Sequence, residues 1–392
     1  MQRLRLLVVT LAHFCVDSYA TMVVPALPFL SERLGFGLAF TGVLAAIPSV
    51  TGISQIGMGL WADRMRRRYL GIGGVALAAL FTPLIGIASS YWMLAAFLAI
   101  GGVGVAAFHP QTFALAGELS GRRRSFGIAL FAFGGTMALG GTPLWVSWFG
   151  SGPGMEYLPL VAIPGLVFAV VMLRTVPLDN PHVAHGAVSL SDSLRGAGRP
   201  LAVITLVVVL RSVSGMGIGT YIAFLGRERG LSALESGAAL SAYSAAGVVG
   251  SLLFGYLADR FQPKLLTWTT ILVSCPLLLG YVHLEGPLSY VLMTLGGGLL
   301  LASNSVLVAL AQQVAPRNTA LASSLPLGLA WGLAALALPP IGALADRIGL
   351  STVLTWVALL PLVTTCVALL LPRVEPALAG DDGNSEDRHE AN

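Results

Sequence analysis

Twelve apolar stretches of membrane-spanning length recur along this chain of 392 residues, and they constrain its fold more than any other feature. Most are long enough to cross a hydrocarbon core of ~30 Å as an α-helix. Hydrophobic residues make up 56% of the chain and charged residues only 10%, whereas soluble domains are about a quarter charged. We therefore expect an all-α integral membrane protein with twelve transmembrane helices. The expected spans are residues 5–28, 38–62, 69–89, 91–117, 124–149, 157–174, 200–226, 235–258, 264–284, 286–314, 319–344 and 350–372.

Positively charged residues are distributed unequally between the two ends of these spans. With the amino terminus in the cytoplasm, sixteen lysines and arginines fall on inner segments and four on outer segments. The positive-inside rule then predicts that both termini are cytoplasmic and that the protein lies in the inner (plasma) membrane of the cell. The net charge of +4 reflects this topology, and we expect no nucleic-acid partner. The outer residues are Arg33, Arg227, Arg229 and Arg347.

A short motif at the end of the second expected span recurs at the end of the eighth. The copies are Gly59-Leu-Trp-Ala-Asp63-Arg64 and Gly255-Tyr-Leu-Ala-Asp259-Arg260. Their offset is 196 residues (255 − 59), which is half the length of the 392-residue chain. The repeat therefore predicts two six-helix halves of like topology, related by pseudo-symmetry.

The repeat and the polar segments define the expected domains. We expect an N-terminal half at 1–174, a cytoplasmic linker at 175–199, a C-terminal half at 200–373 and a disordered acidic tail at 374–392. A third copy of the motif, Ala345-Asp346-Arg347, lies on the outer side and breaks the offset. This copy should have a different role from the two inner copies, and the sequence assigns it no function.

The first copy and the residues after it resemble a signature of the major facilitator superfamily, Gly-x-Leu-x-Asp-Arg-x-Gly-Arg-Lys. Trp61 stands in place of the usual Leu and Arg66 in place of the second Gly. Further stretches resemble the fosmidomycin-resistance-like group of that superfamily: His13-Phe-Cys-Val-Asp17, Phe108-His109-Pro110 and Leu210-Arg211-Ser212. The resemblance covers essentially the whole chain and implies the major facilitator fold, with proton-driven transport by alternating access, often efflux.

The Asp-Arg copies on the inner side have a physical interpretation of their own. A carboxylate at the cytoplasmic end of one helix can face the amino end of a neighbouring helix and pair with arginine. Such bonds hold only while that side is closed, so we expect a cytoplasmic gate. Its predicted members are Asp63, Arg64, Arg67, Asp259 and Arg260. The alternative is that these residues only anchor the helices at the membrane interface.

Three ionisable side chains in the first and fourth expected spans are candidates for proton coupling or substrate binding, because such groups are expensive in mid-membrane. Asp17 follows His13 by four residues, so both lie on one helix face. We predict that Asp17 and His109 carry protons and that His13 contacts substrate. The alternatives are a permanent structural pair at Asp17 and a neutral, hydrogen-bonded imidazole at His109.

The second half offers a charged counterpart. Arg211 is the only basic residue inside the seventh span and must meet an acid, an anion or water; Asp17 is the expected internal partner. The repeat offset places Asn304 opposite His109. The resemblance implies that helices one, four, seven and ten line the cavity, and these four residues lie on those helices. Tyr221 and Tyr243 are further substrate-binding candidates, with packing as the alternative.

Small residues in the fifth span, Gly134-Gly135, Gly140-Gly141 and Pro143, permit close helix approach and bending. They resemble the antiporter motif of the superfamily, although Thr142 separates the last glycine from the proline. Generic packing is the alternative role.

Together these features predict a proton-coupled exporter of a small organic molecule. The closest alternative is an uptake symporter or uniporter for an organic anion, and another is a non-transporting membrane sensor. We expect no enzyme, because no phosphate-binding loop, catalytic triad or zinc cluster is present, and the three cysteines lack metal-ligand spacing. No metal or cofactor is expected, and the expected partners are a substrate, protons and the lipid bilayer, with the protein a monomer.

Overall fold

The computed structural model describes residues 2–179, 197–315 and 319–374. Twelve helices within these ranges are long and apolar enough to cross a membrane. Their bounds agree with the expected spans to within a few residues, except that the first continues to Leu34. The all-α fold with twelve spans is therefore confirmed, whereas the acidic tail and most of the expected linker lie outside the described residues.

The first six spans are built from eight α-helices and short 3-10 segments. Proline breaks the first span into two helices: Pro25 has no N–H to donate to the carbonyl of Thr21, and α1 ends at Thr21. The helices are α1 Arg3–Thr21, α2 Val23–Leu34, α3 Leu38–Gly52, α4 Gln55–Arg64, α5 Tyr69–Phe81, α6 Tyr91–Leu119, α7 Arg124–Ser151 and α8 Ala162–Thr175, with η1 Thr82–Ile87, η2 Gly121–Arg123 and η3 Met155–Val161.

The last six spans are mostly unbroken. The eleventh is interrupted by a π-helical turn at Leu325–Leu329, which contains Pro326, and π-turns of this kind often accompany function. The helices are α10 Gly198–Glu228, α11 Ala233–Ala258, α12 Pro263–His283, α13 Pro287–Val314, α14 Thr319–Ser324, α15 Ala330–Ala335, α16 Leu338–Ile348 and α17 Leu350–Ala368.

The chain forms two compact units that do not coincide with its sequence halves. The first takes in residues 1–187, 216–245 and 331–354, and the second takes in 188–215, 246–330 and 355–392, as far as these are described. The boundaries fall inside α10, α11, α15 and α17. The expected halves, 1–174 and 200–373, describe the sequence repeat and differ from the compact units. They therefore stay a prediction.

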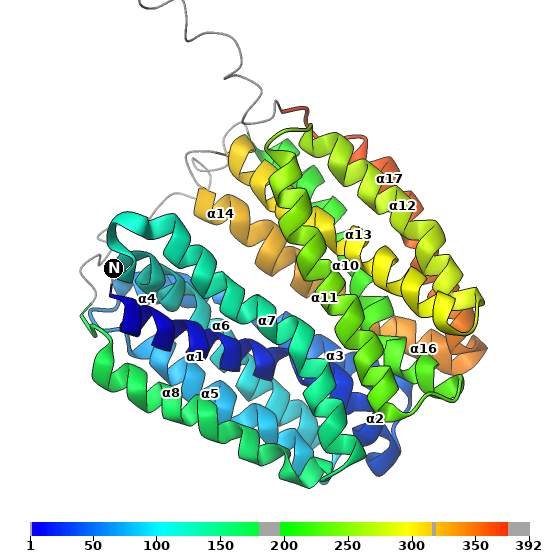
Figure 1. Ribbon diagram of the computed structural model, residues 1–392, viewed down its shortest axis with the longest axis horizontal. Coiled ribbons are helices and arrows are strands. Elements are labelled where there is room, and N and C mark those ends of the chain that lie inside the picture. The colour runs from blue at the N-terminus through cyan, green and yellow to red at the C-terminus, as the bar shows by residue number, and fades with distance from the viewer. Residues whose placement is uncertain (1, 180–196, 316–318, 375–392) are drawn as a thin grey trace, which may run out of the picture. The chain divides into compact units, whose positions relative to one another are not determined.

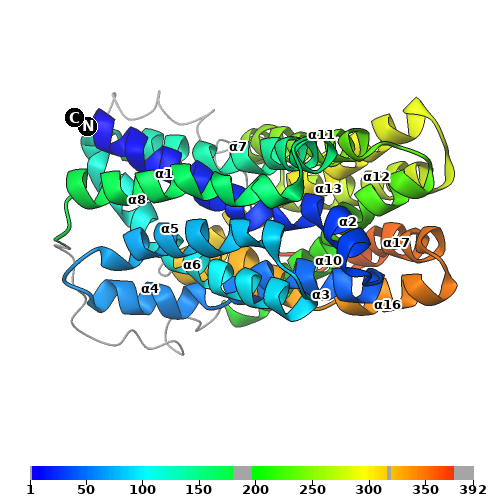
Figure 2. The same cartoon turned by 90° about the horizontal axis from the view of Figure 1, so that it is seen from below.

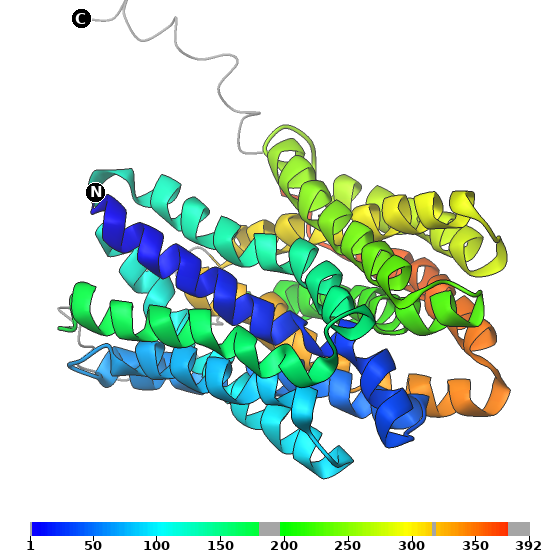
Figure 3. The ribbon, with the colours of Figure 1, turned by 60° about the horizontal axis from the view of Figure 1, so that its bottom comes forward.

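The first unit surrounds α1 with other helices. This helix runs between α7 and α8 (Figure 1 and Figure 3), while α5 packs on α6 and α3 packs on α16 (Figure 2). Two clusters of buried apolar side chains fill the unit, one containing Val16 and Phe108 and the other containing Cys15 and Tyr19. Since both clusters reach the same turn of α1, Asp17 lies where they meet.

The second unit has α12 and α13 packed along each other (Figure 1). A carbon atom added at Gly250 of α11 would lie 3.2 Å from the Ala302 side chain of α13 and closer still to the Gly298 carbonyl oxygen. The absence of side chains at these positions lets the two helices approach closely.

Large apolar side chains are exposed on both units. Examples are Trp92 at 78% exposure, Leu252 at 67% and Leu370 at 68%. Apolar surface of this extent needs a lipid environment rather than water. The protein is therefore a multi-pass membrane protein.

Candidate functional site

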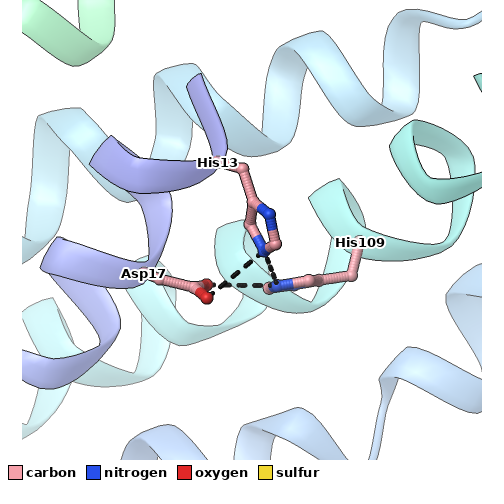
Figure 4. A group of neighbouring side chains, drawn as sticks. All are labelled: His13, Asp17 and His109. Atoms are coloured by element: carbon pink, nitrogen blue, oxygen red, sulfur yellow. Dashed lines mark hydrogen bonds and ion pairs between the residues drawn. The ribbon is translucent and has the colours of Figure 1, made fainter. Parts of the chain in front are cut away.

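The site in the first unit begins with two residues one turn apart on α1. The Nε2 atom of His13 lies 3.2 Å from Oδ2 of Asp17, which confirms that the two side chains share a helix face (Figure 4). His13 is almost fully buried, whereas 17% of the Asp17 side chain is exposed. Asp17 is thus the more accessible end of this pair.

His109 of α6 completes a three-residue cluster. Its Nε2 atom lies 3.1 Å from Oδ1 of Asp17 and 3.3 Å from Nε2 of His13 (Figure 4). The two imidazole rings meet edge to face, with centroids 5.1 Å apart. Asp17 therefore bridges the two histidines. The expected pairing of Asp17 with Arg211, which belongs to the second unit, stays a prediction.

Backbone carbonyls fix the tautomer of both histidines. Nδ1 of His13 lies 2.7 Å from the carbonyl oxygen of Phe131, and Nδ1 of His109 lies 2.9 Å from that of Val105. A carbonyl oxygen only accepts hydrogen bonds, so each Nδ1 must carry its hydrogen and donate it. In the neutral rings both Nε2 atoms are then left with a lone pair.

The four atoms at the centre of the cluster, the two Nε2 atoms and the two oxygens of Asp17, are consequently all acceptors when the rings are neutral and Asp17 is ionised. Two Nε2 lone pairs and a carboxylate face one another at 3.1–3.3 Å with no hydrogen between them. One added proton makes one N–H···O hydrogen bond, and a second makes the other. The cluster therefore has places for two protons, and its net charge passes from −1 through 0 to +1 as they are filled.

Two residues of α7 shape the cluster through contacts that were not predicted from the sequence. The ring of Phe131 stacks on His13 with centroids 4.1 Å apart. A carbon atom added at Gly135 would lie 2.6 Å from Nε2 of His13 and closer still to Asp17. The pair Gly134-Gly135 predicted that another helix approaches closely, but not that the side chains of His13 and Asp17 lie there.

The same three side chains offer ligand atoms of the kind that transition metals bind. These atoms lie within 4.8 Å of one another, and among the described residues no fourth histidine, cysteine or carboxylate joins the group. Histidine ligands in metal sites also commonly donate their other ring N–H to a carbonyl. The expectation of no metal therefore stays a prediction, to be tested with the proton-binding function.

The second unit holds its own buried pair. Arg211 of α10 is fully buried, and its Nη2 atom donates to the amide oxygen of Asn304 of α13 at 3.2 Å and lies 3.2 Å from the hydroxyl of Ser212. The structure thus brings together two predicted substrate-binding residues. The two predicted tyrosines belong to the first unit.

Tyr221 and Tyr243 are both packed inside the first unit. The hydroxyl of Tyr221, which is fully buried, lies within hydrogen-bonding distance of the carbonyl oxygens of Leu38 and Leu338, at 3.2 and 3.0 Å. Tyr243 is 3% exposed and lies beside Gly219. The substrate-binding roles of both tyrosines stay predictions.

The basic residues after the first Asp-Arg copy contact the start of the segment between the halves. Nε of Arg67 lies 3.3 Å from Asp179 on the surface, whereas Arg68 is buried and bonds both carboxylate oxygens of Glu118, at 2.6 and 2.7 Å. The backbone N–H of Arg68 also donates to the Leu178 carbonyl at 2.8 Å. Neither Glu118 nor this attachment was predicted.

The remaining gate candidates are only partly described. The side chain of Asp63 lies outside the described residues, and Arg64 is exposed as the last residue of α4. Asp259 is exposed, and the guanidinium of Arg260 lies over the ring of Tyr256, 4.7 Å from its centroid. The cytoplasmic gate therefore stays a prediction.

Curated relatives match nearly the full length of the chain. It is 24% identical to an uncharacterized MFS-type transporter, YfnC, of Bacillus subtilis, over 94% of this chain and 92% of that protein. It is 23% identical to the fosmidomycin resistance protein of Escherichia coli, over 90% and 89%. The gentisate transporter of Corynebacterium glutamicum is 26% identical over 54% of this chain and 51% of its own length.

Solved structures show the same fold. A bacterial homologue of the human lysosomal transporter Spinster, in an inward-facing and unoccupied conformation, superposes with a TM-score of 0.83 at 16% identity, over 94% of this chain and 96% of that one. A mutant of the nucleoside transporter NupG gives 0.77 at 14% identity, over 95% and 100%. These neighbours are transporters and not enzymes. A sequence profile of the Major Facilitator Superfamily matches residues 9–334, and the chain belongs to that family.

Proposed function

We propose that this transporter couples the export of a small organic molecule to proton entry, with the cluster of His13, Asp17 and His109 as the proton site. The observation that carries the proposal is the convergence of acceptor atoms from three side chains at 3.1–3.3 Å, with both Nδ1 hydrogens donated to carbonyls. Such a cluster is hydrogen-bonded internally only when it holds added protons. Proton binding therefore changes both its charge and its internal bonding.

Alternating access gives these protons a direction. A carrier that exposes one site to each side in turn can take up protons where they are abundant and release them on the other side. Because the Asp17 and His109 side chains are 17% and 16% exposed, protons can reach them while His13 stays enclosed. Exchange follows if the loaded cluster and the bound substrate favour different states of the carrier.

For the substrate we propose a small organic anion held by Arg211 and Asn304. The arginine is permanently charged and fully buried, and its amide neighbour adds both donor and acceptor capacity. Two relatives are named for small organic compounds, fosmidomycin and gentisate. These compounds are therefore the first candidates to be assayed.

The proposed orientation places both termini in the cytoplasm, as the positive-inside rule predicts. Residues 2 and 374 lie on the same side because an even number of spans, twelve, separates them. Protease accessibility of a carboxy-terminal tag in right-side-out and inside-out vesicles tests this orientation.

The decisive experiment measures proton flux in proteoliposomes with a fluorescent pH indicator inside. Fosmidomycin or gentisate is added on one side under imposed pH gradients of either sign. Substrate-dependent proton movement should occur with the wild type and disappear in Asp17→Asn, while substrate counterflow without a gradient remains. Glu285→Gln, which neutralises an exposed loop carboxylate, is the matched control and should behave as wild type.

Two results would overturn the proposal. One is undiminished proton-coupled transport by Asp17→Asn. The other is a stoichiometric zinc ion in the purified wild type that is lost in His109→Gln, because a resident metal would occupy the lone pairs that the protons need. Net uptake driven by the inward proton gradient would retain the proton site but reverse the proposed direction.

A further inference from the structure

We infer that Asp346 is a gating residue of the transport cycle, which closes the outer end of the carrier by capping α3. Its carboxylate accepts a hydrogen bond at each oxygen, from the backbone N–H of Leu38 at 2.9 Å and from that of Ala39 at 2.9 Å. These are two of the N–H groups that an α-helix leaves without an internal partner at its amino end. A carboxylate there is also favoured by the helix dipole.

The amino end of α3 has no cap of its own. The preceding residue is Gly37, in an extended conformation and with no side chain to accept a hydrogen bond. A carbon atom added at Gly37 would lie 3.0–3.1 Å from the two carboxylate oxygens of Asp346. Serine, threonine, aspartate or asparagine is usual at this position. Because Gly37 has no side chain, the carboxylate of Asp346 has room to approach and to accept hydrogen bonds from both N–H groups.

The backbones of α3 and α16 cross beside this cap. Leu38 and Gly42 lie opposite Leu338 and Gly342: a carbon atom added at either glycine would collide with the carbonyl of the leucine on the other helix. The Tyr221 hydroxyl lies between the two leucine carbonyls. The contact is therefore reciprocal and backbone to backbone.

A further pair joins the same region of the two sequence halves. Nη1 of Arg227 lies 3.1 Å from the carbonyl oxygen of Pro28 and 3.2 Å from Glu32, and its guanidinium lies 4.8 Å from the centre of the Phe29 ring. All of these residues belong to the first compact unit. Helices of the first sequence half, α2 and α3, are thus held by α10 and α16 of the second.

Alternating access requires these contacts to break. When a transporter opens towards one side, its two halves separate at that end, and Asp346 cannot remain within hydrogen-bonding distance of Leu38. The cap therefore belongs to one state and stabilises it relative to the other. Transport by alternating access follows from the family; only the assignment of this end to the outer side rests on the proposed topology.

The test uses pulsed electron paramagnetic resonance distances between spin labels. Labels are placed at Phe40→Cys on α3 and Ile348→Cys on α16, both exposed, in the full chain with Cys15, Cys275 and Cys366 replaced by alanine. No substrate is needed, so the outcome is independent of proton coupling. The unaltered cap should give a predominantly short distance.

Asp346→Ala should raise the ratio of the long to the short distance roughly fivefold, the change given by a typical helix cap of about 1 kcal/mol at 1.4 kcal/mol per factor of ten. Asp346→Asn, which keeps one acceptor oxygen, should lie between. Gly37→Ser should act like Asp346→Ala although Asp346 is intact, because it supplies α3 with a local cap and crowds the carboxylate.

Glu235→Ala is the matched control. Glu235 accepts from the N–H of Ser232 at 2.8 Å and from its hydroxyl, so the substitution removes a carboxylate cap that acts locally at the start of α11. It should leave the distance ratio unchanged. The inference is overturned if Asp346→Ala and Gly37→Ser both leave the ratio at the wild-type value; if Asp346→Ala does not fold, Gly37→Ser alone decides.

Discussion

Arg211 and Asn304 are bonded at 3.2 Å on α10 and α13, as Asp17 and His109 are at 3.1 Å on α1 and α6. The offsets between equivalent members are 194 residues (211 − 17) and 195 residues (304 − 109), close to the 196 of the Asp-Arg repeat. Each half therefore bonds a charged residue of its first helix to a polar residue of its fourth. The pairing thus recurs between the two expected halves with the opposite sign of charge.

This pairing predicts how substitutions at Asn304 act. Asn304→Asp would place a carboxylate beside Arg211 and neutralise it, so affinity for an anionic substrate should fall by roughly tenfold or more. Asn304→Ala should weaken binding less, because the positive charge remains. Binding measured by calorimetry with gentisate or fosmidomycin checks the order, and equal losses in both variants would contradict a direct role of the arginine charge.

Removal of one imidazole should reduce the number of protons that the cluster holds. In His109→Gln the second Nε2 acceptor is lost while Asp17 keeps His13 at 3.2 Å. The pH dependence of transport should then change from a two-proton to a one-proton slope. His283→Gln alters an exposed histidine at the end of α12 and should keep the wild-type slope. An unchanged slope in His109→Gln would exclude that residue from coupling.

Gly135→Ala should separate Asp17 from His13. The added methyl group has no space against either side chain, and overpacking of this kind costs about 1–3 kcal/mol. Proton-coupled transport should fall and the thermal midpoint should decrease. On the same helix, Gly141→Ala meets open space and should be neutral or stabilising by up to about 1 kcal/mol. Equal behaviour of the two variants would show that Gly135 does not serve the cluster.

The buried ion pair of Arg68 and Glu118 should contribute more to stability than the exposed pair of Arg67 and Asp179. The Arg68 side chain is 5% exposed and that of Glu118 is 28% exposed, so Glu118→Gln leaves a buried charge uncompensated and should cost about 3 kcal/mol, the low end for such pairs. Arg68→Met combined with Glu118→Gln should cost less than Glu118→Gln alone. Asp179→Asn breaks the exposed pair with Arg67 and should cost under about 1 kcal/mol. Thermal unfolding in detergent measures all three.

The fold could be predicted from the sequence because a membrane span needs an apolar stretch of about 20 residues, and such a stretch can be recognised from the residues alone. The break after Thr21 was not expected, although Pro25 accounts for it. Within the site, the spacing of His13 and Asp17 fixed their common face, since four residues make about one helical turn. The approach of His109 could not be derived, because the spacing along a chain does not determine how two separate helices are rotated towards each other.

The missed contacts have a common cause. Phe131 binds His13 through its backbone carbonyl, which the side-chain sequence does not reveal. The partner of Glu118, Arg68, lies 50 residues away in the chain, so no local pattern indicates their pairing. Asp346 was recognised as an exceptional copy of the motif, but its partner is the amino end of a helix. The arrangement first expected for Asp63, a carboxylate facing a helix amino end, is the one that Asp346 adopts.

The distance along the chain between Asp346 and the helix that it caps has a consequence for biosynthesis. Leu38 precedes Asp346 by 308 residues, and ribosomes make and deliver the amino-terminal spans first. The second span must therefore enter the membrane before the eleventh has been synthesised. Until then, the free backbone N–H groups of its first turn can bond only to water or lipid headgroups. Nascent chains halted before residue 338 should show fast amide exchange at the start of α3, and completion of the chain should be what protects it.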